Sequence, residues 1–527
     1  MGGVVTEYFR LHNAEQLYES IGEASPSIYY LFIGKTVAHA NDSIGAAPTP
    51  LNHVTGTTYD PWPSMIAMKR VNEADERFLT KRYNWTTNTF YEEYSDRTVG
   101  LDDKSFYVLQ NDDFNVYKVI DNNSGANSTV KPTGTSTDII STSDGYRWKY
   151  MFSLSTAERN RFMSPDYIPV KKIDSDDSSN QFSVQTAAAN GAINHIKVSA
   201  NGTGYFADSG NVVAANSSTV TIATTAAAND SFYVDSAIYF KAGKGLGEVR
   251  RIINYDGSSK VVTVNGAYTT ATIANTQTQY VISPRVVIQG DSGQTTTSLT
   301  KAYVSNTAGG QVRKIDVIAA GLNYGRANVT IIANSSYGSG ATGQAVISPP
   351  GGHGSVAYKE LYAKNVILNA QMVGAEGNTL PTNNDFRTVG IIKDPLLRNG
   401  QAANAAIIDQ CFRLTLTDVS GDFTADEIIT SNESADATGR VVRFSNTNAA
   451  RTQGILRLTD VKSKGTGLMY TLNTTITGAD SGVTATLSAF ARPAVREFTG
   501  DCLYWEQRDK IERDASQTES LQFIAQF

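Results

Sequence analysis

The residue types that most often carry chemistry, histidine and cysteine, are few and scattered in this sequence. Its five histidines are His12, His39, His53, His195 and His353. No two of them have the spacing of zinc ligands, and the chain has neither a Cys-x-x-Cys nor a His-x-x-x-His pattern. We therefore expect no metal site and no bound cofactor.

Two glycine-rich stretches admit a functional and a structural interpretation. His353 lies in Pro349–Gly354, where it is either a base on a flexible loop or part of a turn whose glycines supply positive φ; the turn is favoured. Gly243–Gly247 lacks the Lys-Ser/Thr that ends a phosphate-binding loop, and the residues after it read as a strand. We expect a β-turn there.

Acidic doublets are the remaining candidates for chemistry. They are Glu92-Glu93, Asp102-Asp103, Asp112-Asp113 and Asp176-Asp177. A glycosidase needs two carboxyl groups that face each other across roughly 5–9.5 Å, whereas adjacent acids on a strand point to opposite faces. Folding could still bring two distant carboxyl groups together, so a glycosidase-like pair remains an alternative. The acids at 102–103 and 174–177 are expected in solvated turns.

Nothing in the sequence nominates a nucleophile, so we expect no catalytic residues and no enzyme activity. There is no Gly-x-Ser-x-Gly elbow, and Cys411 and Cys502 are interpreted as buried, reduced thiols. A formal charge of -6 and a pI near 5.5 argue against a nucleic-acid partner. No apolar run approaches the roughly 18 residues that span a bilayer, and the first ten residues do not resemble a secretory signal.

The elements that would position any site are mostly strands. Abundant Gly, Thr, Val, Ile, Tyr and Asn predict a mainly β, multi-domain fold of β-sandwich-like modules with few short helices. One helix is expected over 13–21, with Asn13 as its N-cap. Another is expected over 155–162, where Ser155 and Glu158 form a capping-box pattern and Pro165 ends the helix.

Charge density divides the chain. Residues 1–180 hold 41 charged residues, whereas 181–350 hold 18, and all four tryptophans lie outside that middle segment. The inferred arrangement is a discontinuous core body built from both chain ends, with two separate aromatic-rich domains as the alternative. The predicted divisions are 1–180, 349–411 and 491–527 for the core body, with inserted β-modules at 181–348 and 412–490.

The middle segment contains an internal echo. Gly191 to Val198, followed by Gly202 and Tyr205, matches Gly310 to Val317, followed by Gly321 and Tyr324, at a constant offset of 119. Apolar residues at i, i+3 and i+5 before Gly-x-x-Tyr predict a bulged strand and its turn. Two related β-modules are therefore expected.

Two further patterns predict strands. A weaker echo joins Ile429-Thr430…Ser434-Ala435 to Ile476-Thr477…Ser481-Gly482 within the module at 412–490. Asp256-Gly257 stands between two apolar runs, which predicts a hairpin.

Several stretches outside the charge-poor middle resemble one known family and occur in its order. They are Trp62–Val71, Arg82–Trp85, Thr89–Tyr94, Phe106–Leu109, Val116–Asn123, Ser128–Pro132, Asp144–Phe152, Gly352–Leu361, Asn384–Ile392 with Asp394-Pro395, Gly500–Tyr504, and Arg513 with Gln517–Glu519. Together they resemble the baseplate wedge protein of T-even-like contractile-tailed phages, the subunit found as a dimer in each wedge. The charge-poor middle and the module at 412–490 look like enlargements of the longer, cyanophage-type members.

The resemblance implies a structural protein without catalytic residues, located in the virion at the tail baseplate and assembled in the bacterial host cytoplasm. Its expected partners are a second copy of the chain and other wedge proteins, including the large hub-to-periphery wedge protein. Tyr29, Tyr30 and Tyr94 suit either an interface or a core.

The alternative function is a glycan-binding or glycan-cleaving tail protein, since sugar binding uses exposed aromatics. In the β-rich middle segment these would be Tyr205, Tyr233, Tyr255 and Tyr324.

Overall fold

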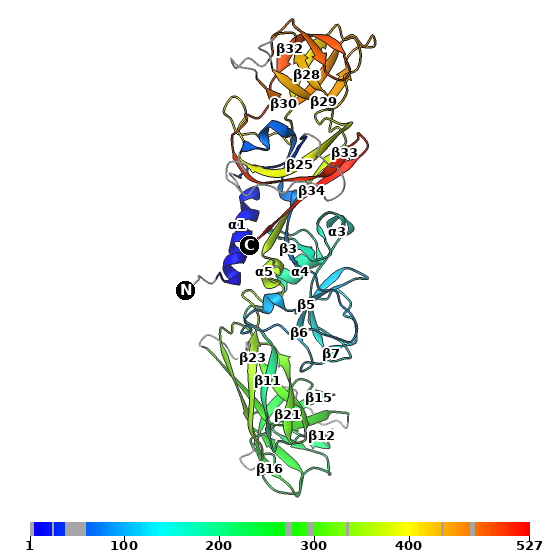
Figure 1. The fold of residues 1–527 in the computed structure, drawn as a ribbon. Coiled ribbons are helices and arrows are strands. Elements are labelled where there is room, and N and C mark those ends of the chain that lie inside the picture. Colours follow the sequence, from blue (N-terminus) through cyan, green and yellow to red (C-terminus); the bar gives the residue numbers. More distant parts are fainter. Residues whose placement is uncertain are drawn as a thin grey trace. The chain divides into compact units, whose positions relative to one another are not determined.

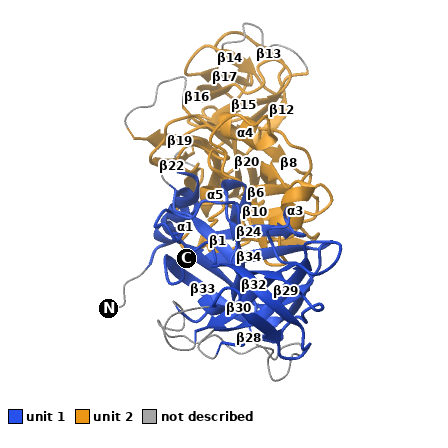
Figure 2. Cartoon of the chain, turned by 90° about the horizontal axis from the view of Figure 1, so that it is seen from above, with its two compact units in different colours: residues 1–79, 364–527 blue, residues 80–363 orange. Residues whose placement is uncertain are grey.

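A computed structural model describes residues 5–23, 26–36, 59–268, 277–291, 299–333, 337–433, 437–463 and 470–527. The chain is mainly β, with many sheets, a small barrel and few short helices, which confirms the predicted fold class (Figure 1). It divides into two compact units, 1–79 with 364–527 and 80–363, coloured separately in Figure 2. No helix among the described residues is long and apolar enough to cross a membrane.

Unit 1 is built from both chain ends around a five-stranded antiparallel sheet. Its order is β26 (Ile407–Asp409), β2 (Met65–Arg70), β1 (Tyr29–Gly34), β25 (Asn384–Lys393), β33 (Asp501–Arg513). β3 (Glu76–Lys81), β24 (Asn365–Val373) and β34 (Thr518–Gln526) form a second sheet. Trp62 and Trp505, from opposite ends of the sequence, lie in one buried cluster with Tyr30 and Phe32. This unit is therefore built from both chain ends, but its N-terminal part is residues 1–79 and not the predicted 1–180.

A closed six-stranded barrel completes unit 1. Its order is β27 (Phe412–Thr417), β30 (Gly454–Lys462), β29 (Thr438–Asn446), β28 (Ile428–Ser431), β31 (Thr475–Gly478), β32 (Thr484–Ala491). The weaker echo places its two copies on neighbouring strands, since Thr430 pairs with Thr477. Ser434 and Ala435 of that echo lie outside the described residues.

Unit 2 begins with a small sheet and an aromatic core. The sheet order is β5 (Tyr107–Gln110), β6 (Asn115–Asp121), β9 (Arg147–Ser153), β8 (Ile140–Ser141), and β4 (Thr89–Phe90) pairs with β7 (Asn127–Ser128). Trp148 is fully buried there with Tyr117, Tyr146 and Tyr150, and Trp85 packs against the same cluster. Two tryptophans therefore belong to a core other than that of Trp62 and Trp505.

The middle of the chain adds two further β-modules to unit 2. A seven-stranded sheet has the order β12 (Asp208–Asn211), β18 (Gln279–Ser283), β15 (Ala237–Ala242), β16 (Val249–Asp256), β17 (Val261–Val264), β14 (Thr219–Thr221), β13 (Ala214–Ala215). A four-stranded sheet has the order β11 (Ile193–Thr203), β23 (Ser339–Ile347), β22 (Ala327–Ile332), β19 (Arg285–Gly290), and β20 (Lys301–Ala308) pairs with β21 (Gln311–Ala319). The hairpin predicted at Asp256-Gly257 is confirmed, because β16 and β17 pair across it.

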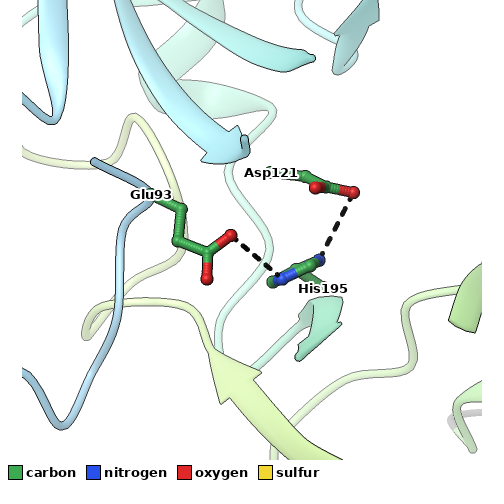
Figure 3. Close-up of side chains that lie close together, drawn as sticks. All are labelled: Glu93, Asp121 and His195. Atoms are coloured by element: carbon green, nitrogen blue, oxygen red, sulfur yellow. Dashed lines mark ion pairs between the residues drawn. The ribbon is translucent and has the colours of Figure 1, made fainter. Parts of the chain in front are cut away.

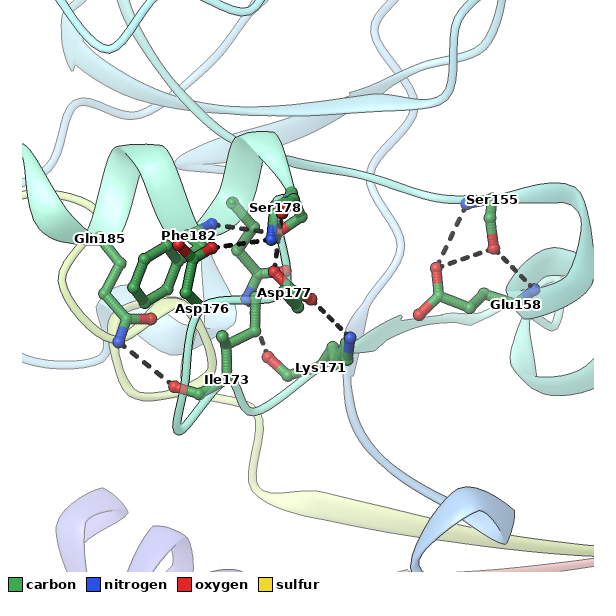
Figure 4. A network of polar contacts seen from close by, with 11 residues as sticks. Ser155, Glu158, Lys171, Ile173, Asp176, Asp177, Ser178, Phe182 and Gln185 are labelled. Carbon is green, nitrogen blue, oxygen red and sulfur yellow. Dashed lines mark hydrogen bonds and ion pairs between the residues drawn. The ribbon is translucent and has the colours of Figure 1, made fainter.

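The structure confirms one helix prediction and corrects the other. α3 (Thr156–Phe162) has the expected capping box, in which Ser155 accepts from the Glu158 amide and Glu158 accepts from the Ser155 amide (Figure 4). α1 runs from Glu7 to Gly22 with Thr6 as N-cap, so the prediction that Asn13 caps it was wrong. The helix starts earlier because Leu11 is buried on the same face as Ala14, Tyr18 and Ile21, and the Thr6 side chain caps the first turn. Two short helices went unpredicted, α4 (Asn180–Thr186) and α5 (Ala357–Glu360).

The acidic run at 174–177 lies in an exposed turn before α4, as expected (Figure 4). Asp176 accepts a hydrogen bond from the amide of Ser178, and Asp177 pairs with Lys171 at 2.7 Å. Asp103 is likewise exposed, but Asp102 is buried in the 3-10 turn η3 (Leu101–Asp103), so the expectation of a solvated doublet fails for Asp102.

The two copies of the stronger echo are bonded to each other reciprocally. The amide of Tyr324 donates to the carbonyl of Gly191 at 3.1 Å, and the amide of Tyr205 donates to the carbonyl of Gly310 at 2.9 Å. Each tyrosine is buried, and each hydroxyl accepts a backbone amide, that of Ala341 for Tyr205 and of Thr300 for Tyr324. The echo therefore folds as two matching bulged strands that close on each other.

The predicted domain boundaries fall inside the two units. Those near 180 and 348 lie within unit 2, and those near 411 and 490 lie within unit 1. Residues 80–180 belong to the same unit as the charge-poor middle.

Gly191 tests the reciprocal contact, and Gly309 is its matched control. Both have φ of +61°, but a Cβ on Gly191 would lie 2.4 Å from the amide nitrogen of Tyr324, whereas one on Gly309 meets nothing within 4 Å. Because both positions carry the same left-handed strain of about 1–2 kcal/mol, the difference measures the close approach. We expect Gly191→Ala to lower the free energy of unfolding by at least ~2 kcal/mol more than Gly309→Ala, measured by chemical denaturation. Equal losses would show that the contact contributes little.

Candidate functional site

Three titratable side chains from distant parts of the sequence meet in unit 2. Glu93 follows β4, Asp121 ends β6, and His195 lies in β11 of the charge-poor middle. His195 Nε2 lies 3.4 Å from a carboxylate oxygen of Glu93, and Nδ1 lies 3.5 Å from Asp121 Oδ2, so the ring stands between the two acids (Figure 3). All three are buried, with side-chain exposures of 4%, 5% and 9% for Glu93, Asp121 and His195.

Each of the two carboxylates has a second polar contact besides His195. Lys197, two residues along β11, places its ammonium 2.7 Å from the second oxygen of Glu93. Asp121 accepts a hydrogen bond of 2.8 Å from the amide of Asn123. With His195 protonated, two cations face two anions, and the cluster is balanced in charge. It borders a polar cavity of about 410 Å³, also lined by Phe90, Asn201, Arg313 and Lys314.

The electrostatics favour the ionised state of every member. Burial disfavours the imidazolium of His195, but Asp121 and Glu93 outweigh burial and raise its pKa to about 9. Burial likewise opposes ionisation of Glu93 and Asp121, yet His195, joined by Lys197 at Glu93, lowers the pKa of both carboxyl groups. At neutral pH the cluster is therefore an imidazolium held between two carboxylates.

A divalent metal fits this arrangement poorly, although one nitrogen and two carboxylates are a common ligand set. A metal needs one ring nitrogen and the carboxylates on the same side, whereas here each ring nitrogen faces its own acid. Lys197 adds a further positive charge at Glu93. The cluster is better described as an ion-pair joint than as a metal centre.

The pair of acids also differs from a glycosidase site. Folding does bring Glu93 and Asp121 together, an outcome the sequence left open. Glycoside hydrolysis requires one of two carboxyl groups to be a protonated acid with a raised pKa. Here both pKa values are lowered, and the imidazole ring fills the space between the acids.

The other candidate residues lie apart from the cluster. His12 is exposed on α1, and His39 and His53 lie outside the described residues. His353 stands in a turn in which Gly351, Gly352 and Gly354 all have positive φ, as predicted.

The predicted turn and the predicted thiols are both present. Gly243–Gly247 forms the turn between β15 and β16. Cys411 and Cys502 are buried and unpaired, and burial raises the pKa of both thiols, that of Cys502 to about 12.

Sequence reasoning missed the cluster because its members are 28 and 74 residues apart. One signal was available. The echo aligns His195 with Lys314, so both copies carry a cation at the same position, and both cations lower the pKa of Asp121. A cation repeated on two bulged strands points to a shared acidic neighbour.

A scan of the chain against protein-family models finds no match, and a search of curated protein sequences finds no relative.

His195→Gln tests the cluster as a joint. The substitution leaves two buried carboxylates facing a single lysine, and breaking a buried ion pair from one side costs roughly 3–5 kcal/mol. We expect a loss of about 3 kcal/mol in unfolding free energy, measured by chemical denaturation. His12→Gln, on an exposed helix face, is the control and should change stability by less than ~0.5 kcal/mol. Similar losses of unfolding free energy in the two variants would show that the ion cluster does not stabilise the fold.

The pH dependence of stability follows from the same pKa shift. The pKa of His195 is about 9 in the folded chain, against 6.5 as its ordinary value. Its contribution is therefore complete below pH 6.5 and is lost as pH rises toward 9, on the order of 3 kcal/mol in total. Denaturation midpoints between pH 6.5 and 9 should fall steeply in the natural chain and much less in His195→Gln. If the denaturation midpoints of the natural chain and of His195→Gln fell in parallel with pH, the pKa of His195 would not be raised in the folded chain.

Proposed function

We propose that this chain is a non-enzymatic structural subunit of a phage tail baseplate wedge, present as a homodimer that assembles with other wedge proteins. The observation that carries the proposal is the set of family-like stretches in family order. Its expected neighbours include the large hub-to-periphery wedge protein, and its location is the virion.

The positions of those stretches in the fold support the proposal. Trp62–Val71 and Asn384–Ile392 supply β2 and most of β25, the two strands that flank β1 in the central sheet of unit 1. Val116–Asn123 and Asp144–Phe152 supply the paired strands β6 and β9 of unit 2. These four stretches thus supply central strands of both units, while the charge-poor middle and the barrel lie outside the resemblance.

The attachment of the barrel also suits a structural subunit. Arg457, on β30, pairs with Asp409 at 2.9 Å, and both side chains are at most 10% exposed. Lys35, fully buried after β1, pairs with Asp385 of β25 and with Asp426 of the barrel, the latter at 3.0 Å. Charged contacts of this kind fix orientation as well as proximity, as a subunit that transmits force requires.

The alternative, a glycan-binding or glycan-cleaving tail protein, loses its proposed contact residues. Tyr205, Tyr233, Tyr255 and Tyr324 are at most 5% exposed, so none can stack on a sugar ring in this fold. The three tyrosines considered for an interface are also buried in the core, Tyr29, Tyr30 and Tyr94. Partner contacts must use other residues.

Assembly in solution tests the proposal. Mass photometry of the full chain should give a species near twice 56.8 kDa, and co-expression with the other wedge proteins of the same phage should yield a stable complex. A glycan array and hydrolysis assays on the same preparation are expected to be negative. A monomer that joins no wedge complex, or turnover of any glycan, would overturn the assignment.

A further inference from the structure

A second cavity in unit 2, of about 270 Å³, carries an excess of positive charge. It is lined by Arg147 and Lys149 of β9, together with His353, Thr137, Asn194 and Asp138. Arg147 and Lys149 are two residues apart on one strand, so both side chains emerge on the same face. The cavity is distinct from the one beside His195, because the two share no lining residue.

Neither cation is neutralised by an acid. Lys149 is 5% exposed and donates to the carbonyl oxygen of Thr137, while Arg147 donates to the carbonyl oxygen of Asn194 at 2.7 Å. Among the described residues, no carboxylate lies within ion-pairing distance of either side chain. A buried ammonium group without a counter-charge is costly, because the interior does not replace its hydration.

Glu360 is the buried acid whose charge most favours the Lys149 ammonium, but its carboxylate is already paired with another lysine. Glu360 pairs with the fully buried Lys118 and accepts hydrogen bonds from the amides of Gly354 and Val356 at 2.7 and 3.3 Å. Asp138 is the acid that lines the cavity, and it is exposed. Two cations therefore face one solvated carboxylate.

His353 supplies a second, independent observation. It is 6% exposed, and its Nδ1 atom is buried without a hydrogen-bond partner. Burial, followed by the charges of Lys118 and Lys149, lowers the pKa of His353 well below its ordinary value, so the ring is neutral. A neutral imidazole carries one N–H group and one acceptor nitrogen, so His353 lines the cavity without adding a charge to it.

We propose that this cavity binds a small oxyanion, with Arg147 and Lys149 as its charged contacts and His353 as a neutral neighbour. A guanidinium presents parallel N–H groups that match two oxygens of a phosphate or carboxylate, and an ammonium adds a point charge. The site goes beyond the structural role and does not depend on it.

Inorganic phosphate is the probe, and the full chain is the sample. Isothermal titration should show saturable binding, and phosphate should raise the unfolding temperature more than sodium chloride at equal ionic strength. Arg147→Gln, at a half-buried position, should weaken phosphate binding at least tenfold. Lys149→Met should do the same and should be no less stable than the natural chain without phosphate, because it removes an unpaired buried charge.

Lys131→Met is the matched control, since Lys131 is a partly exposed lysine of the same unit that pairs with Asp112 at the surface. It should bind phosphate as the natural chain does. Absence of saturable binding to the natural chain would overturn the proposal, as would binding that survives in both cavity variants. The natural-chain titration decides the question even if a variant fails to fold.

Discussion

Two of the added modules, the sheet that contains β11 and the barrel, join their units through charged side chains that are removed from water. In unit 2, His195 and Lys197 of β11 meet Asp121, at the end of β6, and Glu93, in the segment after β4. In unit 1, the barrel presents Arg457 to Asp409. A buried charge without its partner costs several kcal/mol, whereas an apolar contact tolerates sliding. Such joints therefore specify one orientation of module on unit, and the strand registers around them depend on that orientation.

The echo at an offset of 119 adds a second, uncharged constraint. Gly191 and Gly310 hold the left-handed conformation that lets each strand approach the turn of the other, and Tyr205 and Tyr324 close the contact. Neither strand completes its backbone hydrogen bonds without the other. The two strands of the echo, β11 and β21, thus depend on each other. The ion cluster lies at β11, and Lys314 of β21 lies nearby.

Local features of the fold could be predicted from sequence, and long-range ones could not. The capping box at Ser155, the turn at Gly243–Gly247 and the hairpin at Asp256 depend on a few neighbouring residues, and all three are present. The early start of helix α1 was missed although its signals are local, since Thr6 caps the first turn and Leu11 continues the helical spacing of the buried residues. The ion cluster at His195 could not be predicted from neighbouring residues, because its partners come from distant segments that only folding brings near.

A cryo-EM map of the intact phage tail would decide whether this chain is part of the baseplate, as proposed. We expect the chain to fit density in the baseplate as two copies in each of six wedges, with both added modules resolved on their units. Density for the chain only in a fibre or spike would show that it is not a wedge subunit and would favour the glycan-directed alternative.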